Sequence, residues 1–273
     1  MELVAIQMTA GTDWEVNKAR ITELLAQLPQ QRPLLVQLPE NAVTFGSKKA
    51  IVLNAEPVGE GPIQAQFSQW ARELGIWLVV GSMPTCIADS ERFHSTSLVY
   101  NEQGALVGHY HKLHLFDADV ADGQGSYRES DTYAPGNELS VIDSPFGRLG
   151  LSICYDLRFP ELYRALRAQD AEILMVPAAF TRTTGEAHWL PLLQARAIEN
   201  QCYVVAAGLY GEQGKRQTWG HSVIIDPWGK IQTCLPKGQG LISTSVDPER
   251  LAQIRRQMPV AQHARFSADW RSE

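Results

Sequence analysis

Short apolar runs that alternate with helical patterns are the feature that most constrains the fold of this chain. The runs at 3–8, 33–39 and 76–83 indicate strands, and the almost wholly apolar 33–39 indicates a strand covered on both faces. Helical patterns separate these runs: one follows Asp13, a residue that can cap a helix, and another covers 61–75. Such alternation is typical of an α/β fold.

From about residue 95 onward, hairpins interrupt this alternation. The segments 95–115 and 140–156 each join two strands, with turns at Asn101–Gly104 and Pro145–Gly147, and a later hairpin turns at Pro227–Gly229. The remaining expected elements are helices near 160–169 and 187–200, strands at 172–180, 202–210 and 240–247, and a helix from Pro248. The pattern predicts a mixed sheet or a pair of sheets, with helices outside.

The chain is long enough for one large domain. Its 273 residues contain no linker, repeat or low-complexity tract, and a core of this size needs neither disulfides nor a structural metal. We expect one domain over 1–258 and a basic-aromatic tail over 259–273. The polar segment 116–138 is expected to be a long loop that is functional or mobile.

Charge and composition argue against several classes of function. The net charge is −6 and the 24 basic residues are scattered, so neither nucleic acid nor an anionic membrane surface is an expected partner. No apolar run reaches the roughly 18 residues of a transmembrane helix, and the N-terminus lacks a signal-peptide pattern. The four cysteines are widely separated and form no C-x-x-C pair, which indicates reduced thiols. We therefore expect a cytoplasmic protein.

Cys154 is the strongest candidate for a reactive residue. It stands at the end of an apolar strand, and a helix begins shortly afterwards at Pro160. A thiol near a helix N-terminus faces the positive end of the helix dipole, which favours the thiolate. Backbone N–H groups in such a turn can also receive an oxyanion. By itself, this position is equally compatible with a buried, unreactive cysteine.

Glu40 and Lys112 complete a chemically sensible set. Glu40 follows the strand at 33–39, at the edge where open α/β sheets bind ligands, and Lys112 lies within a strand that also carries Tyr110. The alternatives are a solvated loop glutamate and a lysine on an exposed strand edge. A carboxylate that takes the thiol proton and an ammonium that stabilises charge on a substrate oxygen would suffice for amide hydrolysis.

Other patterns indicate neither a metal nor a cofactor. Strand alternation places His109 and His111 on the face opposite Lys112 and His114, so these histidines are not expected to form a metal site. The sequence also contains no phosphate-binding loop of the G-x-x-x-x-G-K type and no G-x-S-x-G nucleophile elbow.

On these residues the chain resembles the nitrilase (carbon–nitrogen hydrolase) superfamily, from about residue 2 to about residue 265. The resemblance lies in LPE with Glu40, HKLHL with Lys112 and ICYDLRFPEL with Cys154, supported by the flanking HWLPLLQARAIENQ and WGHSVIIDPWGKI. It implies a four-layer α-β-β-α sandwich. It also implies that the assembly is a homodimer or larger, with the C-terminal tail at the dimer interface.

The resemblance assigns roles to the candidate residues. Glu40 is the proton acceptor, Lys112 the proton donor and oxyanion stabiliser, and Cys154 the nucleophile that forms a thioester. The backbone N–H of Tyr155 is expected to help hold the oxyanion. The matching position of a second, supporting glutamate is Glu129, whose alternative is an exposed acid in a loop.

Two further positions bear on substrate recognition. Arg158 matches a position that contacts a substrate carboxylate in relatives with acidic substrates, although it can equally pair with Asp156 or Glu161. Leu190 is a departure, because some close relatives have glutamate there.

Within the superfamily the chain is most similar to Nit-type deaminated glutathione amidases. The match lies in LFDADVADGQGSYRES, HWLPLLQARAIENQCYVVAAG and PVAQHARF. It implies hydrolysis of an N-(4-oxoglutaryl) amide to 2-oxoglutarate and cysteinylglycine, and the GQG at 123–125 favours this branch. The enzymatic alternatives are an omega-amidase acting on 2-oxoglutaramate, a carbamoyl-amino-acid hydrolase and a true nitrilase. A silent scaffold and a redox-sensing thiol protein are alternatives of other classes.

Overall fold

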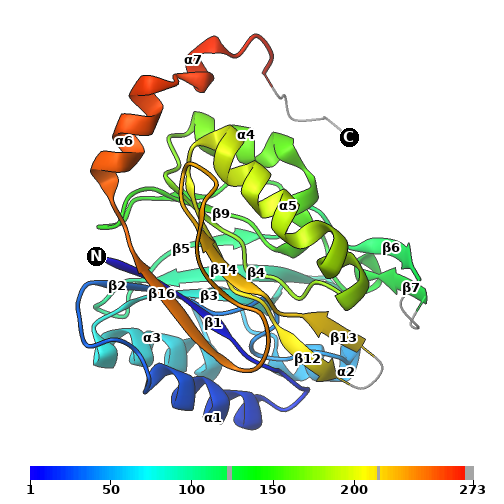
Figure 1. Ribbon diagram of the computed structural model, residues 1–273. Coiled ribbons are helices and arrows are strands. Elements are labelled where there is room, and N and C mark those ends of the chain that lie inside the picture. The colour runs from blue at the N-terminus through cyan, green and yellow to red at the C-terminus, as the bar shows by residue number, and fades with distance from the viewer. Residues whose placement is uncertain (122–124, 214–215, 268–273) are drawn as a thin grey trace.

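The computed structural model describes residues 1–121, 125–213 and 216–267 (Figure 1). Its α-helices are α1 (Trp14–Leu25), α2 (Lys48–Asn54), α3 (Pro62–Leu74), α4 (Pro160–Ala168), α5 (Arg182–Asn200), α6 (Pro248–Gln257) and α7 (Val260–His263), and its 3₁₀ turns are η1 (Glu129–Asp131) and η2 (Cys154–Arg158). The strands of the first half are β1 (Glu2–Gln7), β2 (Leu34–Gln37), β3 (Trp77–Cys86), β4 (Phe93–Tyr100), β5 (Leu106–His111), β6 (Asp117–Val120) and β7 (Gly125–Arg128). Those of the second half are β8 (Val141–Ile142), β9 (Leu149–Leu151), β10 (Ile173–Met175), β11 (Tyr203–Ala206), β12 (Tyr210–Gln213), β13 (Arg216–Trp219), β14 (Ser222–Ile225), β15 (Ile231–Leu235) and β16 (Gly240–Ser245).

Two sheets lie face to face, and helices cover the outer face of each (Figure 1). The strand orders are β16-β1-β2-β3-β4-β5 and β15-β14-β11-β10-β9-β8. In each sheet three neighbouring strands are parallel, β1–β2–β3 or β9–β10–β11, and the strands beside them are antiparallel. Helices α1 and α3 cover the first sheet, and α4 and α5 cover the second. The pair of sheets and the four-layer α-β-β-α sandwich are confirmed.

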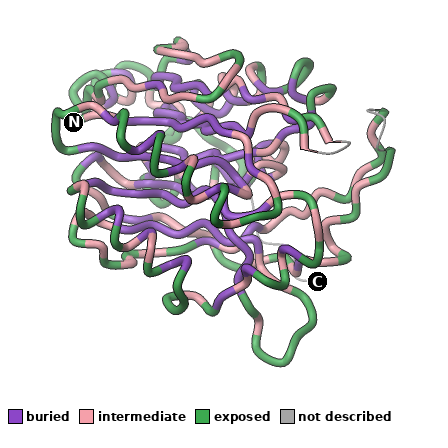
Figure 2. Tube along the Cα trace, turned by 90° about the horizontal axis from the view of Figure 1, so that it is seen from below, coloured by how far each residue is buried: buried purple, intermediate pink, exposed green. Residues whose placement is uncertain are grey.

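Three apolar layers hold these sheets and helices together. Along β2, Leu34 and Val36 pack with the residues of α1 and α3, whereas Leu35 points between the two sheets. On the second sheet, Leu174 and Val204 pack with α4 and α5. Buried residues accordingly follow the strands through the middle of the molecule in Figure 2. Both faces of β2 are covered, which explains its continuous apolar sequence.

The segments at one end of the sandwich differ from the expectations. The expected loop at 116–138 contains the antiparallel ribbon β6–β7 and the turn η1, and β5 ends at His111, so Lys112 follows the strand instead of lying within it. Helix α2 and the ribbon β12–β13 were not expected, and α5 begins at Arg182, earlier than 187. In Figure 1, α2 and both ribbons gather at this end.

The C-terminal segment leaves the body of the sandwich. Helix α6 still packs through Leu251 and Ile254, but residues 261–267 are exposed (Figure 1). The end of the expected tail, 268–273, and most of the GQG motif, within 122–124, lie outside the described residues. No helix in the described ranges is long and apolar enough to cross a membrane.

Candidate active site

A cavity of about 400 Å³ opens at the end of the sandwich where α2 and the two ribbons gather. Its lining includes Glu40, Lys112, Glu129 and Cys154, which are far apart in the sequence. The structure thus brings together the four side chains that were expected to carry or support the chemistry.

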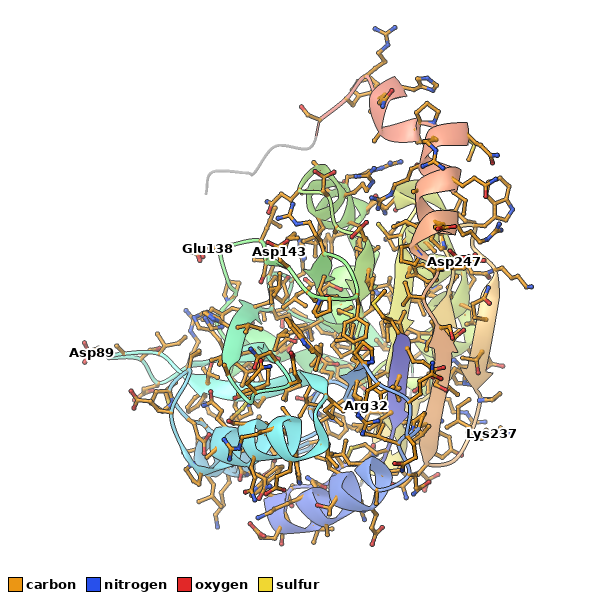
Figure 3. The ribbon with its side chains drawn as sticks, turned by 90° about the vertical axis from the view of Figure 1, so that its left-hand side faces the viewer. Arg32, Asp89, Glu138, Asp143, Lys237 and Asp247 are labelled. Carbon is orange, nitrogen blue, oxygen red and sulfur yellow. The ribbon has the colours of Figure 1, made fainter. Side chains whose placement is uncertain are left out.

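Glu40 and Lys112 are buried, unlike ordinary charged residues at the surface. Figure 3 shows that the labelled side chains of Asp89 and Lys237 project outward from the body. By contrast, Glu40 is 3% exposed and Lys112 is 2% exposed. A buried charge is stable only with partners, so the surroundings of these two residues decide what they can do.

Glu40 is held immediately beyond the end of β2. The chain at Leu38 and Pro39 lies against β3, and only glycine fits at Gly81, because a Cβ there would collide with the backbone of both residues. One Glu40 oxygen, Oε2, accepts a hydrogen bond from the Ala179 N–H at 2.7 Å. The other oxygen, Oε1, faces Lys112.

Lys112 donates to two carboxylates. Its Nζ lies 2.9 Å from Glu40 Oε1, and 3.0 and 2.9 Å from the two oxygens of Glu129. The backbone is fixed on both sides, since the Lys112 N–H donates to the Ser95 carbonyl and its own carbonyl accepts from Gly136. Burial opposes the charged form, but the carboxylates of Glu129 and Glu40 outweigh it and raise the pKa of Lys112 well above its usual value. The ammonium is therefore permanently charged at neutral pH.

Glu129 reaches Lys112 from the turn η1. Its Oε2 also accepts a hydrogen bond from the Phe116 N–H at 2.6 Å, which fixes the plane of the carboxyl group. Burial and the nearby Glu40 raise the pKa of Glu129, although Lys112 pulls it down. One ammonium thus lies between two carboxylates in a mostly buried cluster.

Cys154 lies beside this cluster in a strained conformation. It follows β9 with a φ of 49°, in the left-handed region, and its N–H donates to the Pro177 carbonyl. Burial and the negative charge of Glu40 raise the pKa of Cys154 well above its usual value. The expectation that the helix N-terminus favours a thiolate was therefore wrong, because burial and Glu40 outweigh the dipole. The resting thiol is therefore protonated at neutral pH.

A buried aspartate, missed by the sequence reasoning, fixes the turn at Cys154. Asp156 accepts hydrogen bonds from the Ile153 N–H at 2.8 Å, from Tyr110 Oη at 2.8 Å, and from the backbone and ring of His114 at 3.0 and 2.7 Å. These bonds connect the turn at Cys154 to β5 and to the segment that follows it. The only signal in the sequence is an aspartate two positions after the cysteine.

Other expected residues lie outside this cluster. The guanidinium of Arg158 lies over the Tyr155 ring at 5.7 Å, and its Nη1 is 3.2 Å from His188 Nδ1. Within the described residues Arg158 forms no ion pair with Asp156 and does not line the cavity. A substrate contact by Arg158 stays a prediction. Leu190 packs on α5 against the core of the second sheet.

A histidine stack lies on the other face of β5. His111 stacks on His94 with ring centroids 4.1 Å apart and contacts His109 at 4.9 Å, so His109 and His111 share a face as expected. Burial, together with the two neighbouring rings, lowers the pKa of His111 to about 4. Over residues 1–121, 125–213 and 216–267, no group of three or more His, Cys, Asp and Glu side chains is arranged to hold a metal ion.

Comparisons with known proteins agree with this geometry. The family described as carbon–nitrogen hydrolase matches residues 3–256. A protein of Yersinia enterocolitica named deaminated glutathione amidase is 47% identical over 263 residues, which are 96% of this chain and 92% of the relative.

Solved structures show the same fold. The Caenorhabditis elegans NitFhit protein has a TM-score of 0.88 and 34% identity over 97% of this chain, which spans 65% of that longer protein. A variant of the amidase from Nesterenkonia sp. AN1, which shows Michael addition of acrylamide at the active-site cysteine, has a TM-score of 0.78 and 25% identity over 95% of this chain and 98% of its own.

Proposed function

The chain belongs to the carbon–nitrogen hydrolase family and is an amide-hydrolysing enzyme, and we propose that it cleaves a small carboxylated amide through a thioester on Cys154. The substrate we propose is deaminated glutathione, which the enzyme would split into 2-oxoglutarate and cysteinylglycine. The Yersinia enterocolitica relative that carries this name is 47% identical over nearly the whole chain, which supports the choice.

The observation that carries the mechanism is that a protonated thiol, a carboxylate and an ammonium line the same cavity. Glu40 and Cys154 line the same cavity, the charge of Glu40 acts on the thiol, and Glu40 Oε1 lies 2.9 Å from Lys112 Nζ. Glu40 takes the thiol proton as the sulfur attacks the amide carbonyl. The ammonium of Lys112 and the N–H of Tyr155 stabilise the negative charge on the tetrahedral oxygen.

Collapse of this intermediate breaks the C–N bond and leaves an acyl thioester. The departing amine takes the proton that Glu40 removed from the thiol, either directly or through Lys112, which Glu40 then reprotonates, and becomes cysteinylglycine; Glu40 is thereby left as a carboxylate. Glu40 then removes a proton from water, whose oxygen attacks the thioester carbonyl. The thiol regains its proton, and the carboxylic acid leaves.

Glu129 supports the reaction without touching the reacting atoms. Its two oxygens contact Lys112, and its charge is the largest favourable influence on the Lys112 ammonium. We propose that it keeps Lys112 charged and aimed at the substrate oxygen while Glu40 exchanges its proton.

We also propose a cytoplasmic homodimer or larger homo-oligomer. Exposed apolar side chains support an assembly: Trp228 is 56% exposed, Ile198 on α5 is 48% exposed, and Phe266 in the C-terminal segment is 96% exposed. In such an assembly the domain would cover residues 1–258, and the tail over 259–273 would lie at the dimer interface.

The test is a substrate panel run with the wild type and with Cys154→Ala. We expect the highest kcat/KM on deaminated glutathione, with Cys154→Ala inactive on every substrate. A higher kcat/KM on 2-oxoglutaramate would assign an omega-amidase, a preference for carbamoyl amino acids would assign that hydrolase, and ammonia from simple nitriles would assign a nitrilase. Normal turnover by Cys154→Ala would overturn the mechanism for all of them.

A further inference from the structure

Outside the catalytic cluster, the cavity has a positively charged rim. The cationic side chains there are Lys48, Arg128 and Arg216, and among the described residues the further acid in the lining is Asp131. This local excess is opposite in sign to the net charge of the whole chain, −6. With the catalytic cluster included, the described lining holds four cations and three carboxylates, and a local excess of one sign of charge attracts ligands of the other sign. The rim therefore favours an anionic substrate.

Two of these cations lie in open surroundings. Lys48 is exposed on α2, with its Nζ 3.4 Å from the Asp131 carbonyl. Arg128 is also exposed and forms an ion pair with Asp119 at 2.9 Å. Exposed long side chains lose conformational entropy when they bind, which weakens their contribution to recognition.

Arg216 is organised before any ligand arrives. Its side chain is half-buried, and its guanidinium lies over the rings of Phe45 at 5.4 Å and Tyr127 at 5.7 Å. Both rings line the cavity, and they come from different parts of the chain. Aromatic faces attract a guanidinium and hold its plane.

The strand that carries Arg216 is fixed to the backbone that holds the proposed base. Thr218 on β13 pairs with Thr181, and the Trp219 N–H donates to the Phe180 carbonyl at 2.9 Å. Ala179, in the same segment, donates its N–H to Glu40. The guanidinium is therefore held in a fixed relation to the site where the carbonyl would react.

We propose that Arg216 binds a carboxylate of the substrate and selects carboxylated amides over neutral ones. The planar guanidinium can donate two parallel hydrogen bonds to a carboxylate, which a lysine cannot do. This inference rests on the proposed function in one respect: the substrate is an amide that carries a carboxylate. Deaminated glutathione has one on each side of the scissile bond, and the experiment distinguishes the two.

The experiment compares Arg216→Gln with the wild type on three amides. Deaminated glutathione carries both carboxylates, 2-oxoglutaramate only that of the acyl half, and butyramide none. We expect kcat/KM on deaminated glutathione to fall about 10- to 100-fold, mainly through KM, as for loss of hydrogen bonds to a charged group. Butyramide turnover should change by less than about 3-fold. An equal fall on 2-oxoglutaramate assigns the acyl carboxylate, and no change there assigns the carboxylate of the leaving half.

Two matched variants control for charge and folding. Arg128→Gln removes a charge from the same rim and should lower kcat/KM on carboxylated amides less than Arg216→Gln does, because Arg128 is exposed. Arg216→Lys keeps the charge and should recover part of the loss. An equal loss on neutral and carboxylated amides, or no loss on either, would overturn the proposal.

A second measurement separates this proposal from the proposed function. The rate of Cys154 alkylation by iodoacetamide is followed on its proteolytic peptide by mass spectrometry, and 2-oxoglutarate or cysteinylglycine bound in the cavity should protect the thiol. We expect at least one of them to protect the wild type and to do so about 10-fold less well in Arg216→Gln, whatever the preferred substrate. If neither protects the wild type, or if protection is unchanged in the variant, Arg216 has no such role.

Discussion

Replacing Lys112 by methionine should destabilise the protein in a manner that depends strongly on pH. The lysine Nζ has three carboxylate oxygens within 3.0 Å, one from Glu40 and two from Glu129. Methionine is similar in size and also apolar along its length, so Lys112→Met removes the charge with little change in packing. Two carboxylates that shared one ammonium then face each other in a buried site.

The magnitude follows from this charge balance. Two like charges about 4–5 Å apart at an effective dielectric constant of about 20 repel by roughly 3–4 kcal/mol. That value agrees with the roughly 3–5 kcal/mol lost when one partner of a buried ion pair is removed. One carboxyl group of the pair can escape this repulsion by binding a proton, so its pKa in the folded variant rises above the unfolded value of about 4.3.

The sign of the pH dependence is fixed by that proton. Above pH 4.3 the folded variant holds a proton that the unfolded chain has released, so the free energy of unfolding falls as pH rises. Urea unfolding should therefore show a small loss relative to wild type at pH 5 and a loss of about 3–5 kcal/mol at pH 8. The double variant Lys112→Met/Glu129→Gln should recover much of the loss at pH 8.

Lys18→Met is the matched control, since Lys18 is a surface lysine whose partner, Glu15, lies 4.0 Å away. It should change the free energy of unfolding by less than about 0.5 kcal/mol at either pH. A loss for Lys112→Met that is equal at pH 5 and pH 8, or no recovery in the double variant, would refute the reasoning about two uncompensated carboxylates.

The other predictions concern the proposed base Glu40, the buried aspartate Asp156 and the histidine stack. Glu40→Gln should lower kcat by about 10²–10⁴-fold. It should also shift the pH midpoint of Cys154 alkylation downward, because the carboxylate that raises the thiol pKa is gone. An upward shift of this midpoint would contradict the electrostatic account. Asp156→Asn should cost about 2–4 kcal/mol in urea unfolding, because an amide cannot accept all the bonds that the buried carboxylate accepts; a loss below about 0.5 kcal/mol would show that these bonds do not hold the loop. His111, with a folded pKa of about 4, stays neutral while the unfolded chain binds a proton, so stability should fall as pH drops from about 6.5 to about 4, by on the order of 1 kcal/mol after solvent screening. His111→Asn should flatten that slope, and an unchanged slope would assign it to other groups.

The sequence pattern predicted a mixed sheet or a pair of sheets with outer helices because the core is periodic, whereas the four-layer sandwich was implied by the family resemblance. Runs such as 33–39 and the alternation of hairpins and helices reflect burial on two faces of each sheet, and burial leaves a local pattern. Glu40 and Cys154 follow buried strands, so their positions near a shared edge could be inferred from where those strands end.

The segments that form the walls of the cavity show no such pattern in their sequence. Helix α2 is short, and the ribbons β6–β7 and β12–β13 are polar, so neither periodicity nor propensity marks them. The proposed role of Arg216 can be recognised only in the folded structure, where its guanidinium lies over the rings of Phe45 and Tyr127 from two other segments of the chain. Asp156 is similar, because three of its four hydrogen-bond donors belong to Tyr110 and His114, which lie 46 and 42 residues away in the chain.

The protonation state of the Cys154 thiol could not be predicted from the sequence either. Proximity to a helix N-terminus suggested a thiolate at Cys154, but the pKa of the thiol depends on burial and on the carboxylate beside it. Such effects are set by tertiary contacts, and the same local motif in an exposed loop would behave differently.

The most direct test of the mechanism is to trap the acyl intermediate. Rapid acid quenching during turnover of a slow amide substrate, followed by proteolysis and mass spectrometry, should find the acyl half of the substrate, without the amine half, on the peptide that contains Cys154. The adduct should be released by hydroxylamine, as a thioester is. An acyl group on another residue, or turnover at the normal rate with no adduct at Cys154 under conditions that make deacylation slow, would contradict the account.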